Sequence, residues 1–449
     1  MRMIYKLEKP DLSKFDNGKV IELMKNKELL KITRRTTNPD YLYWDKIKYK
    51  FKQDLPKGTT AEELWLLTKF LRKYFSERTI TPIKNEKGER FSFIRLSRFE
   101  QFLHETDLNM GGSLFVNSGD DKEKRKYQFI SRGIMEEAIA SSQLEGANTT
   151  RKEAKEFLRE GRLPRTKDEK MILNSYNARK AIEERYKDEK LNLQTLFELH
   201  GILTIGTIND EEIGRFRTDK DNVVVANDKD DMVYHVPPKE KFVKKEIKEL
   251  IKFANDETET QFVHPVTKAI LIHFWLGYLH PFTDGNGRLA RALFYWYLSK
   301  KNYWAFAYLP ISKVIKNSPT QYGMAYVLAE QDDCDLTYFI DYNIDKMQSA
   351  MKDFEAYVEK KRRENLEISK ISKSKYDLND RQLQLLQYLN GNKYGKTSVS
   401  VYKNINNLKS RVTATSDLKK LKGQGFLYSK KKGKEVLYFA TDKIDELFE

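Results

Sequence analysis

The stretch His280–Arg291, which reads HPFTDGNGRLAR, decides how the middle of this chain folds. It follows an apolar run over 264–279, HPVTKAILIHFWLGYL, and it leads into a second apolar run, RLARALFYWYLSK. A helix that is apolar nearly all round is buried, and Pro281 disfavours helical geometry at His280. We therefore predict a buried central helix over 264–279, a tight loop, and a second helix that begins near residue 286.

The loop carries residue types that together suit a nucleotide phosphate. A Gly-Asn-Gly segment, Gly285–Gly287, at the start of a helix presents backbone N–H groups to an anion. Arg288 and Arg291 are three residues apart, so they share one face of that helix and can bind further phosphate oxygens. Asp284 is a candidate Mg²⁺ ligand, and His280 can accept a proton near neutral pH. The loop thus predicts a phosphate site beside a general base, which suits attack by a hydroxyl on phosphorus.

Composition sets broad limits on the rest of the protein. The chain has 449 residues, a prior of roughly three domains, and a formal net charge of +16. The positive charge favours nucleotides, nucleic acid or acidic proteins as partners, although a lysine-rich proteome would also explain it. Cys334 is the only cysteine, so a disulfide within the chain and a thiolate metal cluster are excluded. We expect a cytoplasmic protein without a membrane segment, because the longest apolar run is too short to span a bilayer.

The sequence pattern predicts a mainly α protein with four regions. An N-terminal, mostly helical region covers 1–127, a helical core covers 128–350, a helical linker covers 351–376 and a winged-helix domain covers 377–449. The helices include Ala61–Phe75 and one over 130–146, whereas the stretch over 108–126 is loop-like. Within the core, β-branched runs on both sides of a polar ANDKDD turn predict a β-hairpin over 214–238.

The C-terminal segment is more basic than the rest of the chain. Residues 371–449 contain 16 Lys and Arg but 8 Asp and Glu, in three short helical patterns and a basic strand-turn-strand. The third helix and the KKKGK wing could contact DNA, whose backbone attracts exposed cations. A protein-contact or dimerisation role remains the alternative, and a homodimer stays open. The candidate DNA contacts on the third helix are Ser416, Lys419, Lys420 and Lys422.

The motif over His280–Arg291 resembles the signature of the Fic family, H-x-F-x-[D/E]-G-N-G-R-x-x-R, at every position. The resemblance extends over about residues 128–347 and implies a helical Fic core in which the predicted hairpin is a flap. It also implies transfer of AMP from ATP to a Ser, Thr or Tyr hydroxyl of a protein, with release of pyrophosphate. Family members that act as kinases carry lysine where this chain has Gly287.

The resemblance further implies a role for each motif residue. His280 would be the base for the target hydroxyl, and Asp284 would bind Mg²⁺. Tyr322, after the motif, would lie near the adenine. The remaining residues would hold the phosphates of ATP: Gly285, Asn286 and Gly287 at the α- and β-phosphates, Arg288 at the β-phosphate and Arg291 at the γ-phosphate.

Two further segments take roles from the same resemblance. SSQLEG, Ser141–Gly146, resembles the inhibitory signature of the family, [S/T]-x-x-x-E-[G/N], so Glu145 would pair with Arg291 and displace the γ-phosphate. The alternative for this short motif is an ordinary solvated helix end. In the flap, a strand over NVVV would dock the target segment as an added strand. The residues concerned are Ser141 and Glu145 in the inhibitory motif, and Asn222, Val223, Val224 and Val225 in the flap.

Two other functions remain open from the sequence. The same loop could transfer another nucleotide or a phosphocholine group. Alternatively, the protein could be a DNA-binding regulator in which the core only senses a nucleotide. The presence of His280 argues against a core that only senses, because binding phosphate does not need a base.

Overall fold

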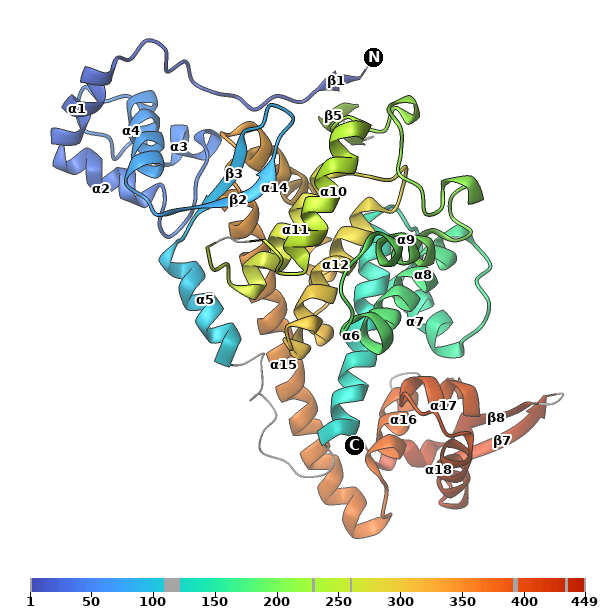
Figure 1. Ribbon diagram of the computed structural model, residues 1–449. Coiled ribbons are helices and arrows are strands. Elements are labelled where there is room, and N and C mark those ends of the chain that lie inside the picture. Colours follow the sequence, from blue (N-terminus) through green and yellow to red (C-terminus); the bar gives the residue numbers. More distant parts are fainter. Residues whose placement is uncertain are drawn as a thin grey trace. The chain divides into compact units, whose positions relative to one another are not determined.

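The computed structural model is mainly helical, with three small sheets among the residues it describes (Figure 1). It describes all residues except 1, 109–121, 228–230, 259–260, 391–394, 433–434 and 448–449. Most of the stretch predicted to be loop-like over 108–126 lies outside the described residues. The chain forms two compact units, each built from three segments. The first unit contains 1–114, 181–304 and 315–348, and the second contains 115–180, 305–314 and 349–449.

The N-terminal part of the first unit is a group of short helices followed by a hairpin. The predicted helix over 61–75 is confirmed as α4, which begins with a capping box in which Thr60 and Glu63 bond to each other's backbone N–H groups. A two-stranded hairpin follows, in which the run RTITPIK pairs antiparallel with RFSFI. The elements are α1 Asn17–Lys25, α2 Lys27–Arg35, α3 Trp44–Lys50, α4 Ala61–Tyr74, β2 Arg78–Lys84, β3 Arg90–Ile94 and α5 Ser97–Leu108.

The rest of the first unit is built around a buried helix pair. The predicted central helix is confirmed as α11, Pro265–Leu279, which has Pro265 in its first turn and is buried along most of its length. It packs against α12, Asn286–Lys300, and Trp275 and Trp296 of the pair are fully buried. Around them lie a π-helical turn at Ile182–Tyr186, α9 Leu193–Thr204, α10 Glu240–Ala254, α14 Pro319–Gln331 and the first turns of α15 Thr337–Lys375.

The predicted flap hairpin is confirmed, but it is shorter than predicted. Strand β4, Val225–Asn227, pairs antiparallel with β5, Met232–His235. Asn222 adopts a left-handed conformation with φ 47°, so the strand begins at Val225, and Val223 and Val224 precede it. Part of the polar turn lies outside the described residues. A third strand, β1 Met3–Ile4, pairs parallel with β5 in the order β1-β5-β4, so β4 is an edge strand.

In the second unit, α6 Lys122–Leu144 is followed by α7 Arg151–Glu160 and α8 Lys167–Ala181. Helix α6 begins earlier than the predicted residue 130, and the chain leaves it at Gly146, whose φ is 95°. The short elements η5 Trp304–Tyr308 and α13 Ile311–Ile315, and the remainder of α15, complete this part. Its core is the cluster Met135, Ile139, Ala154, Phe157, Leu158 and Ile172.

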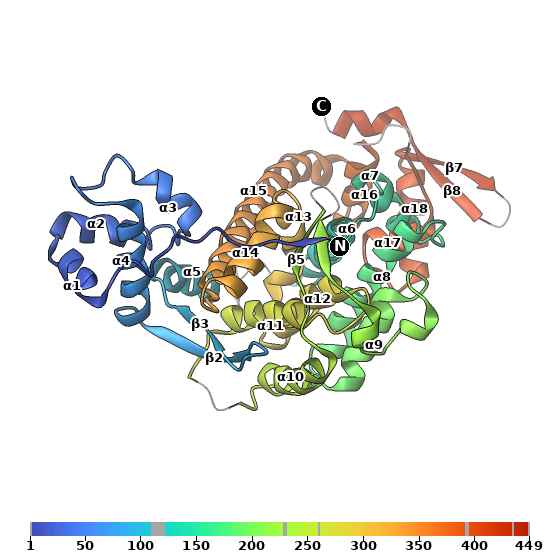
Figure 2. The same cartoon turned by 90° about the horizontal axis from the view of Figure 1, so that it is seen from above.

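The C-terminal part of the second unit has its own core. Three helices alternate with a sheet of order β6-β8-β7, and Leu385, Tyr402, Leu418 and Phe426 are buried between them. Helix α17 lies beside α7 (Figure 2), and Asn404 of α17 donates to the carbonyl of Arg159 at 2.9 Å. Part of the predicted KKKGK wing, at 433–434, lies outside the described residues. The elements are α16 Asp380–Asn390, β6 Lys396–Thr397, α17 Val399–Ile405, α18 Arg411–Gly423, β7 Leu427–Lys432, β8 Glu435–Ala440 and η6 Asp442–Leu447.

Across the described residues, no helix combines the length and the apolar character that crossing a membrane requires.

Candidate active site

The motif loop, residues 280–287, begins with His280 in an unusual backbone conformation. His280 follows the last turn of α11 with φ 46° and ψ 58°, a left-handed geometry that is uncommon for residues other than glycine. Its ring Nδ1 lies 3.2 Å from the carbonyl oxygen of Gly277. A carbonyl can only accept, so Nδ1 carries the proton and Nε2 is the basic nitrogen. The half-buried ring is thus oriented by the helix it ends, as a general base requires.

Arg217 holds the backbone on both sides of His280. Its side chain is buried, and its Nε donates to the carbonyl of His280 at 2.7 Å. Its Nη2 donates to the carbonyl of Pro238 at 2.5 Å, and its backbone N–H donates to the carbonyl of Pro281 at 2.9 Å. A planar guanidinium that bonds several carbonyls fixes their relative positions. Arg217 therefore links the segment before the flap to the motif loop.

A neutral histidine supports the centre of the loop. Phe282 is fully buried and stacks on His200 of α9, with ring centroids 3.8 Å apart. The N–H of Gly214 donates to His200 Nδ1 at 3.2 Å, so Nε2–H donates to the carbonyl of Asp284 at 3.0 Å. Burial lowers the pKa of His200 to about 4, which keeps the ring neutral at pH 7. The loop backbone is thereby held by an uncharged donor.

Asn286 and Gly285 set the shape of the turn into α12. The buried amide of Asn286 donates to the carbonyl of Phe282 at 2.8 Å and accepts from its N–H at 2.9 Å. Gly285 has φ 82°, and a Cβ there would lie 2.7 Å from Thr204 Cγ2, so glycine is required on both counts. The side chain of Asn286 therefore closes the loop. Gly287 lies in the first turn of α12 and is partly exposed.

The charged residues of the motif divide into exposed and buried groups. The Asp284 carboxylate is 45% exposed, and its Oδ1 accepts from Arg288 Nη2 at 3.2 Å. Arg288 is fully buried and also donates to the carbonyl of Leu203 at 2.9 Å. Arg291, one turn further along α12, is buried as well. Arg288 thus positions Asp284, and both arginines belong to the first two turns of α12, whose N-terminal end attracts anions.

The donor set at the loop is compatible with Mg²⁺. Among the described residues, no cluster of three or more His, Cys, Asp or Glu side chains could hold a metal by itself. Mg²⁺, however, is usually bound through one or two carboxylates together with substrate phosphates and water. The exposed carboxylate of Asp284 meets that requirement.

The other predicted site residues lie on several elements. Tyr322 of α14 bonds through its hydroxyl to His273 Nε2 at 2.8 Å, and burial, aided by the charge of Arg291, lowers the pKa of His273 to about 3. Ser141 is buried in α6 of the second unit, whereas Glu145 follows the end of that helix and is exposed. In the flap of the first unit, Val224 is 43% exposed.

Two residues that position the loop were not predicted. His200 is one of several polar residues in the helical pattern NLQTLFELHGILT, and Arg217 lies in the charged run GRFRTDKD. Neither has a spacing that points to the motif, because both act through contacts between segments far apart in the sequence. The burial of His200, which the structure shows to be complete, was not marked by any pattern in the sequence.

Residues 190–298, which include the motif loop, α9, α11 and most of α12, match the family model described as Fic/DOC family. The chain contains a Fic domain. This Fic domain is 31% identical over 105 residues to "Protein adenylyltransferase fic-1" of Caenorhabditis elegans, covering 23% of this chain and 18% of that protein. It is 33% identical over 107 residues to "Protein adenylyltransferase Fic" of Nematostella vectensis, covering 24% and 22%. The chain thus spans about a fifth of the length of these relatives.

Solved structures of Fic proteins also align with this chain. A structure of Fic-1 from Caenorhabditis elegans aligns with a TM-score of 0.47 and 15% identity, covering 76% of this chain and 97% of that one. A Fic family protein from Desulfovibrio desulfuricans aligns with a TM-score of 0.45 and 18% identity, covering 77% and 95%.

Proposed function

We propose that the Fic domain transfers AMP from ATP to a Ser, Thr or Tyr hydroxyl of a protein, a class of target that includes hydroxyls of this chain itself. The observation that carries this proposal is the motif loop, which fixes an oriented histidine base at one end and the start of a helix with two arginines at the other. The names of the two relatives, both protein adenylyltransferases, support the same reaction.

The proposed reaction follows from the chemistry of the loop. His280 Nε2 takes the proton of the target hydroxyl, and the hydroxyl oxygen attacks the α-phosphorus of ATP. The bond from that phosphorus to the oxygen bridging to the β-phosphate breaks, and pyrophosphate leaves. Mg²⁺, held by Asp284, would neutralise phosphate charge when bound. Transfer of this kind depends on positioning and electrostatic stabilisation, which a loop held by buried side chains can supply.

We propose a separate role in ATP binding for each residue of the motif. The backbone of Gly285–Gly287 at the start of α12 would bind the α- and β-phosphates. Arg288, which is buried and bonded to Asp284, would act at the β-phosphate, and Arg291 at the γ-phosphate. Tyr322 would border the adenine.

The flap offers a place for the target. Strand β4 is at the edge of its sheet, and an edge strand can accept an extended peptide through backbone hydrogen bonds. The strand was predicted over Asn222–Val225, but it begins at Val225, so we propose that the target segment pairs with β4 from Val225 onward, which would present a hydroxyl with little sequence demand. Cross-linking of a target to this segment checks the proposal, and modified hydroxyls found only within rigid helices would contradict it.

The resemblance of Ser141–Gly146 to an inhibitory signature supports regulation of the same domain. We propose that Glu145 pairs with Arg291 and so occupies the cation that would bind the γ-phosphate. ATP would then bind with its phosphates displaced, and the α-phosphorus would lie out of line with the hydroxyl.

The test is to incubate the full chain with labelled ATP, GTP, UTP and CTP and to measure label on protein. The proposal predicts labelling by ATP above the other three nucleotides. Preferential labelling by another nucleotide would assign a different donor to the same loop. Binding of a nucleotide without any labelling, also in the Glu145→Gly variant, would favour a core that only senses nucleotide.

The C-terminal part supports a second role, in DNA binding. We propose that its three helices and its β6-β8-β7 sheet form a winged helix and that α18 lies against DNA. Val412, near the start of α18, is 80% exposed, and Ser416, Lys419, Lys420 and Lys422 are exposed on the same helix. Lys420 bonds to Asp377 and Lys422 to Ser429, so of these three lysines only Lys419 has no hydrogen bond or ion pair to a described side chain.

Mobility shift of the full chain on duplex DNA tests this role. We expect weak binding near 50 mM salt that falls steeply by 200 mM, since each phosphate contact releases counterions. The Lys419→Gln variant should bind more weakly, and Lys360→Gln, an exposed lysine on α15, is the control. The absence of any shift at low salt would favour a protein-contact or dimerisation role.

A further inference from the structure

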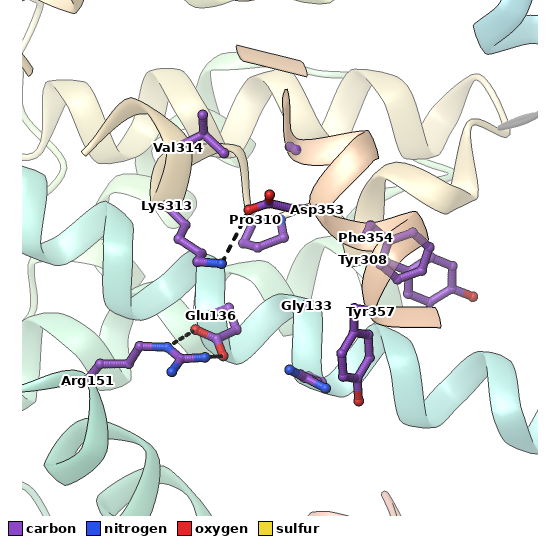
Figure 3. A pocket seen from close by; sticks show the side chains of 12 residues that line it. Gly133, Glu136, Arg151, Tyr308, Pro310, Lys313, Val314, Asp353, Phe354 and Tyr357 are labelled. Atoms are coloured by element: carbon purple, nitrogen blue, oxygen red, sulfur yellow. Dashed lines mark hydrogen bonds and ion pairs between the residues drawn. The ribbon is translucent and has the colours of Figure 1, made fainter. Parts of the chain in front are cut away.

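The second unit contains a pocket of about 70 Å³ that belongs to no part of the motif (Figure 3). It lies between α6, the segment 308–314 and α15. Three aromatic side chains line it, and two of them, Tyr308 and Phe354, stack with ring centroids 5.7 Å apart. Five charged side chains also line the pocket: Arg132, Glu136, Arg151, Lys313 and Asp353.

Arg132 is the residue that points to a ligand. Its guanidinium lies 3.5 Å from the ring centroid of Tyr357. The side chain donates no hydrogen bond to a described residue. Burial, together with repulsion from Arg151 and Arg159, lowers the pKa of Arg132 to about 10, although Glu136 opposes the shift. A guanidinium has five N–H donors, and those of Arg132 are not taken up by any described residue. The N–H groups of Arg132 are not sealed from water, so an acceptor that enters the pocket can reach them.

The carboxylates of the pocket are already engaged by other cations. Glu136 accepts from Arg151 Nε at 2.8 Å and also from Lys155, so its charge is balanced without Arg132. Burial lowers the pKa of Lys155 to about 8, and neighbouring arginines add to the shift. Lys313 lies 3.6 Å from Asp353, a separation longer than a hydrogen bond, and Asp353 is mostly exposed. Positive charge is in excess here, and Asp353 can turn to water.

The volume of the pocket indicates the size of ligand that it can hold. A cavity of about 70 Å³ holds roughly five to seven water-sized groups. One phosphate group, with its five non-hydrogen atoms, fits this space. Guanidinium groups bind phosphate oxygens in pairs, and lysine binds them as a point charge. We propose that the pocket binds one phosphoryl dianion, held by Arg132 and Lys313, either as free phosphate or as part of a phosphorylated side chain.

A phosphate bound to α6 would affect the labelling reaction, because Glu145 follows the end of this helix. The same helix carries Arg132 and Glu136 near its middle and ends just before Glu145. Helices α6 and α13 are already joined by a hydrogen bond from the N–H of Ser312 to Glu137 at 2.9 Å. A dianion bound by Arg132 of α6 and Lys313 of α13 would join the two helices a second time. Bound phosphate would therefore hold α6 in place and lower labelling. This second step rests on the proposed inhibitory role of Glu145, whereas the binding itself does not.

Binding is tested on the full chain with inorganic phosphate, by calorimetry and thermal unfolding, against chloride at matched ionic strength. We expect saturable binding and a rise in Tm of roughly 3 °C at about ten times Kd. Arg132→Gln and Lys313→Gln should each weaken binding by tenfold or more. Arg165→Gln, an exposed arginine of the same unit outside the pocket, should not. Equal binding by all three variants, or no binding of either phosphate or a phosphoserine peptide below tens of millimolar, would overturn the proposal.

Two further experiments identify the source of the phosphoryl group and test the effect of its binding on labelling. A phosphoserine peptide that binds where phosphate does not would assign the pocket to a phosphorylated side chain. Phosphate should lower labelling of the parent chain several-fold but leave Arg132→Gln and Glu145→Gly unchanged, although Glu145→Gly still binds it. Equal inhibition of all three would place the effect at the ATP site and overturn the regulatory step. Binding in a protein that shows no labelling at all would refute only the proposed function.

Discussion

The motif loop is supported by buried side chains, whereas the segment Ser141–Gly146 carries an exposed carboxylate. The loop has buried contacts on every side: Arg217 bonds its backbone, Phe282 stacks on His200, and Asn286 bridges its two ends. At the end of α6, Ser142 is fully buried and bonds to Ser175, but Glu145 lies beyond the helix with its side chain exposed.

The difference matches what each region would have to do. A transfer site loses rate when reacting groups shift by about 1 Å, so its supports must be rigid before ATP arrives. An inhibitory carboxylate must be able to leave its partner, so an exposed position at a helix end suits it. The comparison predicts that changes in the loop abolish labelling, whereas changes at Glu145 increase it.

His280→Ala should have the largest effect. Loss of the base should lower labelling by at least 10²–10⁴-fold, while ATP still binds because the phosphates contact other residues. Labelling rates and nucleotide binding by calorimetry are measured together. His104→Ala, which removes an exposed histidine of α5, is the control. Labelling near the parent rate would show that His280 is not the base.

Gly285→Ala should distort the loop. The alanine would be strained at φ 82° and its Cβ would lie 2.7 Å from Thr204 Cγ2. We expect a loss of unfolding free energy above the roughly 1–2 kcal/mol for the left-handed conformation alone, and about 10²-fold slower labelling. Gly88→Ala is a matched control, because Gly88 has the same φ of 82° with nothing within 4 Å of its Cβ. Similar losses in both variants would show that the contact with Thr204 does not matter.

The neutral state of His200 should make the loop sensitive to acid. Burial lowers the pKa of His200 from 6.5 to about 4. Between these two pH values, the histidine is protonated in the unfolded chain but neutral in the folded chain. The stability that depends on neutral His200 is complete above pH 6.5 and is lost as the pH falls towards 4, by up to roughly 3 kcal/mol. Denaturant unfolding of the parent and of His200→Gln between pH 7 and pH 4 measures the difference. Parallel curves would contradict the assignment.

Glu145→Gly should give the smallest effect and the opposite sign. Release of the inhibitory carboxylate should raise labelling by roughly 10–100-fold. Arg291→Ala should not copy this release, since it also removes a phosphate contact. Glu160→Gly, at the exposed end of α7, is the control for a new glycine at a helix end. If Glu145→Gly labels no faster than the parent, Ser141–Gly146 is an ordinary helix end.

Local patterns predicted most of the helices but fewer of the supports of the site. The apolar run before His280 and Pro265 at its start identified α11, and the Gly-Asn-Gly segment located the start of α12. Both signals lie within a few residues of what they predict. The motif residues could be found for the same reason.

The features that the sequence did not predict depend on contacts between distant segments. Strand β1 has two residues and pairs with β5 more than two hundred residues later, so no local pattern marks it. His200 and Arg217 act on the loop from α9 and from the segment before the flap. Their residue types allow these contacts, but only the tertiary structure selects them.

The most direct test of the proposed transfer uses ATP labelled in two ways. The full chain, its Glu145→Gly variant and the double variant Glu145→Gly, His280→Ala are each incubated with Mg²⁺ and ATP that carries label at either the α- or the γ-phosphate. Label on protein is then measured. We predict that only the α-label becomes protein-bound, that Glu145→Gly increases it, and that His280→Ala removes it. Transfer of the γ-label would show phosphorylation in place of AMP transfer, and would contradict the role proposed for the motif loop.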